Sequence, residues 1–193
     1  MKKHYKLVVT AALLMTSCIP AAVMADSGSD TGGGNLSADA QLNLRVTIPR
    51  FLLFRVGSVG SVDTIIFAPT DAEVGDGNPI AGTGGDAGSG SGANVAVRSN
   101  GGAITITEDN DGGSGGLGSG AGNISLTEIT VTSDNTALDT PALSDAGSNS
   151  INVTLSSGNV TNRTAIWTYA YDNTTTPADG NYDADITYTA ANF

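Results

Sequence analysis

An antiparallel β-sandwich is the fold class that this sequence predicts, for three reasons. Most of its apolar segments alternate apolar and polar residues with a period of two, which is typical of strands with one buried face. These segments are short, and turns rich in Gly, Asn, Asp and Pro separate them. No segment after residue 25 shows a helical period. We therefore expect an all-β, immunoglobulin-like sandwich of about seven to nine strands with long glycine-rich loops.

The first 25 residues predict a secretory signal peptide. Three Lys residues precede or adjoin an apolar segment, 7–15, which is too short to cross a bilayer as a helix. Val-Met-Ala, ending at Ala25, fits the small-x-small rule for cleavage, so we expect the mature chain to start at Asp26. Lipidation at Cys18 is the alternative, although Met15 stands where such sites usually carry Leu. No later segment is long and apolar enough to predict a transmembrane span in the mature chain.

Cleavage of the signal peptide would change which reactive side chains the protein contains. All Lys, His, Cys and Met residues lie within residues 1–25, which leaves five Arg against 19 acidic residues, a formal charge of 5 − 19 = −14. This charge argues against nucleic acid and anionic membranes as partners, because both are polyanions. The composition also disfavours acid–base catalysis by His, nucleophilic catalysis by Cys or Lys, and transition-metal sites. We therefore expect no enzyme, no cofactor and no metal site.

Paired carboxylates are the catalytic arrangement that this composition still allows, as in glycoside hydrolysis. Nearly all of the acids are Asp in turns, and only Glu73, Glu108 and Glu128 offer a longer reach. A cleft that stacks sugar rings is also hard to build from so few aromatic residues. A hydrolase that uses carboxylates alone is therefore the third and least favoured function.

The chain after the signal peptide divides into a flexible Gly/Ser/Asp leader over 26–39 and one sandwich domain over 40–193. In chain order, the expected strands are 41–48, 51–56, 62–67, 94–98, 103–108, 124–132, 150–155, 164–171 and 181–189. Asn100-Gly101 predicts a hairpin turn between the fourth and fifth of these strands, because both residues tolerate a positive φ.

Two segments interrupt the strand pattern. The apolar phase slips by one residue between Leu126 and Ile129, which predicts a bulge or a strand that changes sheets. The stretch 134–149 has room for a short turn of helix, which Pro141 limits.

The aromatic residues of the late strands have two interpretations. Trp167, Tyr169 and Tyr171 share one face and form either a ligand-stacking strip or the core of a sandwich, and the core is the favoured interpretation. A closed eight-stranded membrane barrel is the alternative fold, since Phe193 is the last residue. However, Phe193 lies on the opposite face from Tyr188, and the aromatic residues are too few for two girdles.

Two long glycine-rich loops, 71–93 and 109–123, are the natural places for a binding function or for disorder. Calcium takes oxygen ligands, and its best candidate is Glu-Asp-Asn-Asp-Gly over Glu108–Gly112. This stretch lacks the ligand spacing of a helix–loop–helix calcium site. Solvated loop acids are therefore the favoured interpretation.

The clearest alternating strand lies at the start of the domain, behind the flexible leader. Leu42, Leu44, Val46 and Ile48 form one apolar face, and Pro49 then breaks the strand. Such a strand either pairs within its own subunit as an edge or enters the sheet of a neighbouring copy. Both possibilities remain open from the sequence, and these four residues are the candidate strand-exchange face.

The C-terminal region resembles the ends of small exported bacterial β-sandwich proteins. The residues concerned are Ile-Trp-Thr-Tyr-Ala-Tyr-Asp-Asn (166–173) and Pro-Ala-Asp-Gly-Asn-Tyr-Asp-Ala-Asp-Ile-Thr-Tyr-Thr-Ala (177–190). Gly180, Ala184, Ile186 and Tyr188 are also similar to the last strand of fimbrial subunits, which follows a Gly and alternates apolar residues up to a late Tyr.

This resemblance implies an exported structural or adhesive surface subunit of a Gram-negative bacterium, located in the periplasm, on the cell surface or outside the cell. Its partners would be copies of itself or other surface subunits. The alternative from the sequence is a monomeric secreted module that binds a glycan or calcium with its glycine-rich loops.

Overall fold

The computed structural model describes residues 27–193, except 89, 111–114 and 120–121. The predicted signal peptide, with Cys18, lies outside the described residues. The chain divides into two units, Met1–Ile48 and Pro49–Phe193. In the first unit, residues 27–48 are exposed to solvent and belong to no strand.

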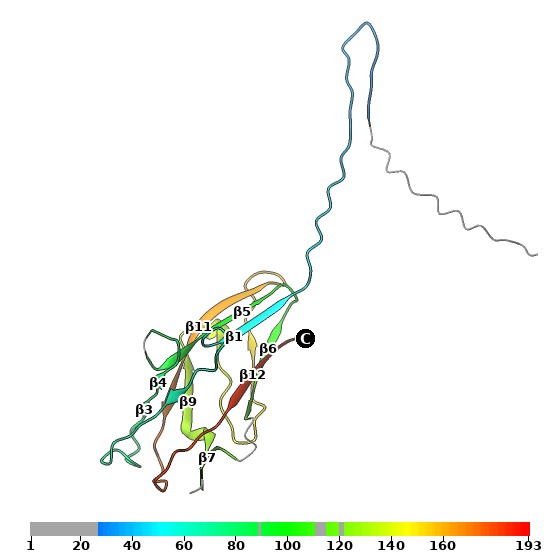
Figure 1. Cartoon of the computed structure of the whole chain (residues 1–193). Coiled ribbons are helices and arrows are strands. Elements are labelled where there is room, and N and C mark those ends of the chain that lie inside the picture. The colour runs from blue at the N-terminus through cyan, green and yellow to red at the C-terminus, as the bar shows by residue number, and fades with distance from the viewer. Residues whose placement is uncertain (1–26, 89, 111–114, 120–121) are drawn as a thin grey trace, which may run out of the picture. The chain divides into compact units, whose positions relative to one another are not determined.

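The second unit is all-β, and Figure 1 shows the course of its strands. No α-helix occurs among the described residues, which include two short 3-10 turns, η1 (Leu126–Glu128) and η2 (Thr136–Leu138). The described residues also include no helix that is long and apolar enough to cross a bilayer. The strands are β1 (Leu52–Val56), β2 (Ile65–Ile66), β3 (Ile80–Ala81), β4 (Thr83–Gly84), β5 (Gly92–Ser99), β6 (Ile104–Asn110), β7 (Leu117–Ser119), β8 (Gly122–Ile124), β9 (Ile129–Ser133), β10 (Ser150–Val153), β11 (Thr161–Tyr171) and β12 (Ile186–Asn192).

These strands form separate antiparallel sheets. The largest has the order β1-β5-β11-β3, with β9 also paired to β11. A second sheet has the order β10-β6-β12, and two small sheets pair β2 with β4 and β7 with β8. Strands β1 and β12 are therefore edge strands of the two larger sheets.

One apolar core takes residues from both of the larger sheets. Trp167 of β11 is fully buried, and its ring meets that of Tyr188 on β12 edge-on, with 5.1 Å between the ring centroids. The indole Nε1 donates a hydrogen bond to the backbone oxygen of Leu138 at 3.3 Å, which satisfies the one polar atom of that side chain. Trp167, Tyr169 and Tyr171 are all buried, which confirms that this strip belongs to the core.

Several strand predictions are confirmed, because their alternation reflects a buried face. The expected strands 51–56, 94–98, 103–108, 150–155 and 164–171 correspond to β1, β5, β6, β10 and β11. The short helical turn expected within 134–149 is η2. The phase slip between Leu126 and Ile129 is explained by η1, which separates β8 from β9.

The predicted hairpin at Asn100-Gly101 is wrong. Strand β5 pairs with β1 and β11, whereas β6 pairs with β10 and β12, so the turn carries the chain from one sheet to the other. The Asn100 side chain explains this outcome, because it binds the backbone of Pro49 and Phe51 at the start of β1 rather than serving only the turn.

Four of the expected strands differ from the structure. Of the strand predicted over 62–67, only β2 forms, and the strand predicted over 124–132 is divided among β8, η1 and β9. The strand predicted over 41–48 is not formed, and the compact unit starts at Pro49. The last strand begins at Ile186 rather than at residue 181. Before Ile186, the backbone of Asp183 pairs in both directions with Gly118, through Asp183 N–H to Gly118 O (3.0 Å) and Gly118 N–H to Asp183 O (2.9 Å).

Candidate functional site

The candidate strand-exchange face is fully accessible in this structure. Leu42, Leu44, Val46 and Ile48 are 82%, 82%, 85% and 74% exposed, and no described strand includes them. Single exposed apolar residues are ordinary, whereas here four of them alternate along one exposed segment.

The start of the compact unit is held by the turn that follows β5. Phe51 N–H donates to Asn100 Oδ1 (2.9 Å), and Asn100 Nδ2 donates to Pro49 O (2.8 Å). The amide of Asn100 thus bonds two backbone groups as a peptide of a neighbouring strand would. Arg50 Nη2 donates to Gly101 O (2.6 Å), and Ser99 Oγ donates to Phe51 O (2.9 Å). Residues 49–51 are therefore fixed in line with β1.

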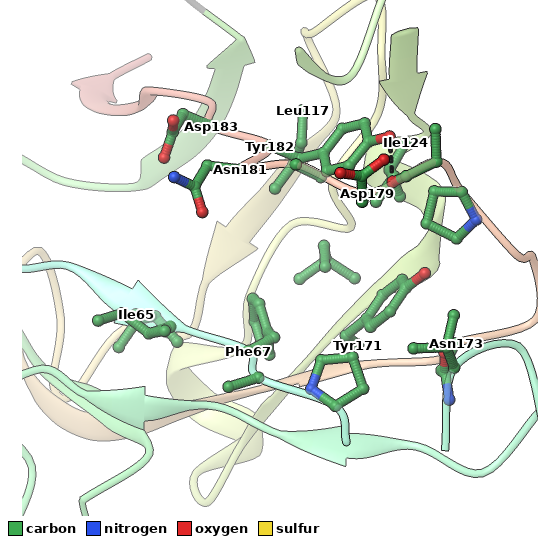
Figure 2. A pocket seen from close by; sticks show the side chains of 18 of the residues that line it. Ile65, Phe67, Leu117, Ile124, Tyr171, Asn173, Asp179, Asn181, Tyr182 and Asp183 are labelled. Atoms are coloured by element: carbon green, nitrogen blue, oxygen red, sulfur yellow. Dashed lines mark hydrogen bonds between the residues drawn. The ribbon is translucent and has the colours of Figure 1, made fainter. Parts of the chain in front are cut away.

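Two adjoining hollows, with volumes of about 770 and 550 Å³, open beside the apolar core. They share lining residues, so we treat them as one feature and call it the groove. Figure 2 shows the larger hollow, with Phe67 and Tyr171 across from Tyr182 and Asp179. Shared lining residues are Thr64, Ile65, Phe67, Leu117, Ile129, Tyr182 and Asp183.

The walls of the groove come from two segments that are distant in the sequence. One wall follows β1 and the chain up to β2, with Phe54, Val56 and Ile65. The other wall follows residues 182–188, which run into β12. Buried core residues such as Leu126 and Tyr169 form the floor. The groove therefore lies over the core, beside the edge strands β1 and β12. These two strands also contact each other.

The outer edge of β1 presents backbone groups toward the groove. Gly57 N–H donates to Asn94 O (2.9 Å) in the register of the β1–β5 ladder. Hydrogen-bonded pairs alternate along an antiparallel ladder, so Leu53 and Arg55 also bond to β5. The backbone groups directed away from β5 are then those of Leu52, Phe54 and Val56, and no described strand pairs with that side of β1.

The same argument applies to β12. Phe193 N–H donates to Ala103 O (3.4 Å), in register with the β12–β6 ladder. The even-numbered residues Ile186, Tyr188 and Ala190 therefore direct their backbone groups away from β6. Among the described strands, none pairs with this side of β12. Each of these two edge strands therefore has one side that pairs with no described strand.

The rim of the groove is acidic. Asp179, Asp183 and Asp185 are exposed along one wall, and Asp63 lies on the other. Asp63 is partly engaged, since its Oδ2 accepts a hydrogen bond from Ser58 N–H at 2.7 Å. Arg55 is the cationic side chain in the lining of the smaller hollow. An apolar floor beneath an anionic rim suits an apolar ligand that carries positive charge at its exposed side.

Sequence reasoning did not find this groove. Its lining combines residues from several widely separated segments, which no local pattern connects. The alternation of Asp with apolar residues over 182–186 was the available signal, since it places the acids on one side and Tyr182, Ala184 and Ile186 on the other. By itself, this alternation predicts a final strand and does not indicate a groove.

Two tyrosine hydroxyls lie together beside the floor of the smaller hollow. The hydroxyl oxygens of Tyr169 and Tyr188 are 3.4 Å apart. Burial raises the pKa of Tyr169 above its ordinary value and raises the pKa of Tyr188 well above it, because the tyrosinate form would lose its hydration.

These raised pKa values predict that alkali destabilises the fold. A native pKa above the unfolded value of about 10 means that stability is complete below pH 10 and falls as the pH rises through the native pKa. We expect part of the tyrosinate absorbance at 295 nm to develop only together with unfolding. A Tyr188→Phe variant serves as the control and should lose less stability between pH 9 and pH 11; an equal loss in both proteins would contradict the prediction.

The first glycine-rich loop, 71–93, is tied to β11 through Asn173. Asn173 is fully buried, and its Oδ1 accepts a hydrogen bond from Gly75 N–H at 2.9 Å. Its Nδ2 donates to Glu73 O at 2.6 Å, while Gly77 N–H donates to Asn173 O at 3.1 Å. This part of the loop is therefore ordered by hydrogen bonds within the protein.

The calcium candidate Glu108–Gly112 is not assembled as a ligand set in the part that the structure describes. Glu108 is buried, and its Oε1 accepts hydrogen bonds from Ser144 Oγ (2.9 Å) and Asn149 N–H (3.2 Å). Asp111 and Gly112 lie outside the described residues. Of the residues described, no three His, Cys, Asp or Glu side chains come together as a metal site would require. The three Glu side chains bind different partners: Glu73 binds Thr70, Glu108 binds Ser144 and Glu128 binds Thr174.

The comparisons with known proteins returned no match, whether against family models, curated proteins or solved structures.

Proposed function

We propose that this chain is an exported structural or adhesive surface subunit of a Gram-negative bacterium, with an immunoglobulin-like sandwich as its compact unit. In this proposal, subunits assemble with one another through the N-terminal segment that carries Leu42, Leu44, Val46 and Ile48. The fimbrial-like pattern of residues 177–190 is in line with such a role.

A single observation carries the proposal. The most regular apolar strand pattern of the chain is exposed and unpaired with any described strand. Burial of a Leu, Val or Ile side chain contributes about 1.5–3 kcal/mol each. A strand that forms backbone hydrogen bonds and buries this face in another molecule would therefore supply a substantial association energy. Ordinary surface loops carry no such pattern.

The corresponding prediction is that the apolar face, and not the length of the segment, drives assembly. Wild-type protein purified after export should form oligomers whose size rises with concentration, seen by light scattering during gel filtration and by electron microscopy. Leu44→Asp together with Val46→Asp should weaken association by at least about 100-fold, because each change loses apolar burial and adds a charge that would have to be buried.

Asn43→Ser together with Thr47→Ser is the matched control, since it changes the opposite face of the same segment. This variant should assemble like the wild type. Wild-type protein that remains a uniform monomer at all concentrations would refute the proposed function.

A second function is favoured by the larger hollow. Its volume of about 770 Å³ suits a small ligand, and its lining combines Tyr171 and Tyr182 with Asp179 and Asn181. Val74 and Leu117 bring both glycine-rich loops to its edge. A monomeric module that binds a glycan there is the alternative, and binding on a glycan array that is lost in Tyr182→Ala would support it.

A further inference from the structure

We propose that the larger hollow binds a small organic cation, a molecule whose apolar body carries an ammonium group at one end and a hydrogen-bonding atom at the other. The ammonium group would lie at the rim, near Asp179 and Asp183, and the hydrogen-bonding atom would meet the buried Tyr171 hydroxyl. This inference does not depend on assembly through residues 42–48. It assigns to the hollow a ligand class other than the glycan of the alternative function.

The Tyr171 hydroxyl is the observation that points to a ligand. Tyr171 is 5% exposed, and its hydroxyl oxygen is buried without a hydrogen-bond partner among the described residues. The same holds for one side-chain oxygen each of Glu108 and Thr161, but these residues lie outside the lining of both hollows, whereas Tyr171 lines the larger one. A buried hydroxyl without a partner costs free energy. This hydroxyl therefore offers a donor and an acceptor to a molecule in the hollow.

Tyr171 is held in place by the sheet and by a neighbouring ring. On β11, it pairs with Ile80 of β3 and with Ile129 of β9. Its ring packs against that of Phe67, with 6.3 Å between the ring centroids and a tilt of 53°. A side chain that is already ordered loses little conformational freedom when a ligand binds. The inner end of the hollow is therefore preorganised.

The lining of the hollow suits an apolar body better than a sugar. Apolar side chains, such as Ile65 and Ile124, make up most of the described lining. Two of its polar groups are already engaged, since the Asn173 amide bonds the backbone of the first glycine-rich loop and the Tyr182 hydroxyl donates to Ala178 O (2.9 Å). A sugar would leave many of its hydroxyl groups unpaired here. An apolar body gains free energy by leaving water.

The charge of the rim selects a cation. Asp179 and Asp183 are exposed members of the lining, and the described lining of this hollow includes no Arg. Figure 2 shows Tyr182 near Asp179, across the hollow from Phe67 and Tyr171. Aromatic rings attract ammonium groups that lie over their faces. Carboxylates and an aromatic ring on one wall therefore favour an ammonium group over a neutral group of the same shape.

Two probes of equal shape but different charge test the ligand class. The cation 3-hydroxyphenyltrimethylammonium carries an ammonium group and a hydroxyl on one ring, and 3-tert-butylphenol has carbon in place of the charged nitrogen. Wild-type protein purified after export should bind the cation about tenfold more tightly than the neutral probe. Titration calorimetry at mildly acidic pH, where both phenols are protonated, measures the two affinities. Equal affinities, or no binding of the cation at millimolar concentration, would overturn the inference.

Charge variants show whether the preference for the cation comes from this rim. Asp179→Asn together with Asp183→Asn should reduce the ratio of the two affinities to about twofold or less, since exposed ion pairs supply part of it. Asp109→Asn together with Asp139→Asn is the matched control, because both residues are exposed and lie outside the lining of both hollows. This control should keep the full preference. An equal reduction in both proteins would assign the preference to the net charge of the chain and would overturn the site.

Tyr171→Phe tests the inner end of the hollow by removing the hydroxyl alone. Binding of both probes should weaken by about 3- to 10-fold, because the ligand loses one hydrogen bond. The thermal midpoint of the ligand-free protein should not fall, since the hydroxyl has no described partner to lose. Unchanged binding together with a lower midpoint would show that the hydroxyl serves the fold, and it would overturn the assigned contact.

Further results separate this inference from the two proposed functions. The variant Leu44→Asp with Val46→Asp lacks the exposed apolar face of residues 42–48 and should bind the cation like the wild type. Binding that is lost together with assembly would contradict the independence of the hollow. A neutral oligosaccharide that binds the hollow when the cation does not would support the alternative function and overturn this inference.

Discussion

Replacement of Trp167 by alanine should lower the free energy of unfolding by about 3–5 kcal/mol. Trp167 is fully buried on the longest strand, β11, and packs edge-on against Tyr188 of the other large sheet. The substitution removes this contact, opens a cavity between the sheets and leaves the Leu138 carbonyl without its indole donor. Urea denaturation followed by circular dichroism measures the loss, since the only Trp is absent from the variant.

The control for this experiment is Val160→Ala, at an apolar residue that is 45% exposed. Its effect should stay within about 0.5 kcal/mol, as for most surface substitutions. A loss below about 1 kcal/mol in Trp167→Ala would contradict the placement of this residue at the centre of the core.

Replacement of Asn173 by alanine should cost about 2–4 kcal/mol, since two effects add. The first is the loss of the side-chain hydrogen bonds with Gly75 and Glu73, which leaves the half-buried Gly75 N–H without its acceptor. The second is the backbone conformation, because Asn173 has a φ of 57°, which Asn tolerates better than Ala. The same denaturation experiment measures the total.

A second variant separates these effects. Asn173→Gly adopts the positive φ without strain, so it should lose only the hydrogen-bond contribution and should be more stable than Asn173→Ala by about 1 kcal/mol. Proteolysis within residues 70–78 should become faster in both variants. Equal stability of the two variants would show that the backbone conformation adds nothing.

The sequence predicted the strands whose faces are sorted between core and solvent. Val95, Val97, Ile104 and Ile106 are all buried, and their alternation located β5 and β6. The sequence did not predict which strands pair with β5 and β6. The turn signal at Asn100-Gly101 is local, whereas the choice of sheet depends on contacts with β1, some 50 residues earlier, where Asn100 binds Pro49 and Phe51.

The candidate site was predictable only in part. The apolar alternation of residues 42–48 is visible in the sequence, because a single strand carries it. The groove is not visible, because Phe54, Ile65, Leu117 and Tyr182 meet only after four segments have folded. Asn173 carried no usable signal either, since its importance comes from its backbone conformation and from a loop about 100 residues away.

The pairing of β5 with β1 and β11, and of β6 with β12, also determines how this polypeptide acquires its fold. Leu52 pairs with Ser99, Ser99 with Thr161, and Asn110 with Ile186, so the main ladders join residues far apart along the chain. Ladders of this kind form slowly, because the entropy cost of closing a long loop comes before the stabilising contacts form. Until Thr161–Tyr171 has been synthesised and has docked, Gly92–Ser99 lacks one neighbour and its valines stay open to aggregation. Newly made chains therefore expose this apolar face for longer than a helical protein of equal size would.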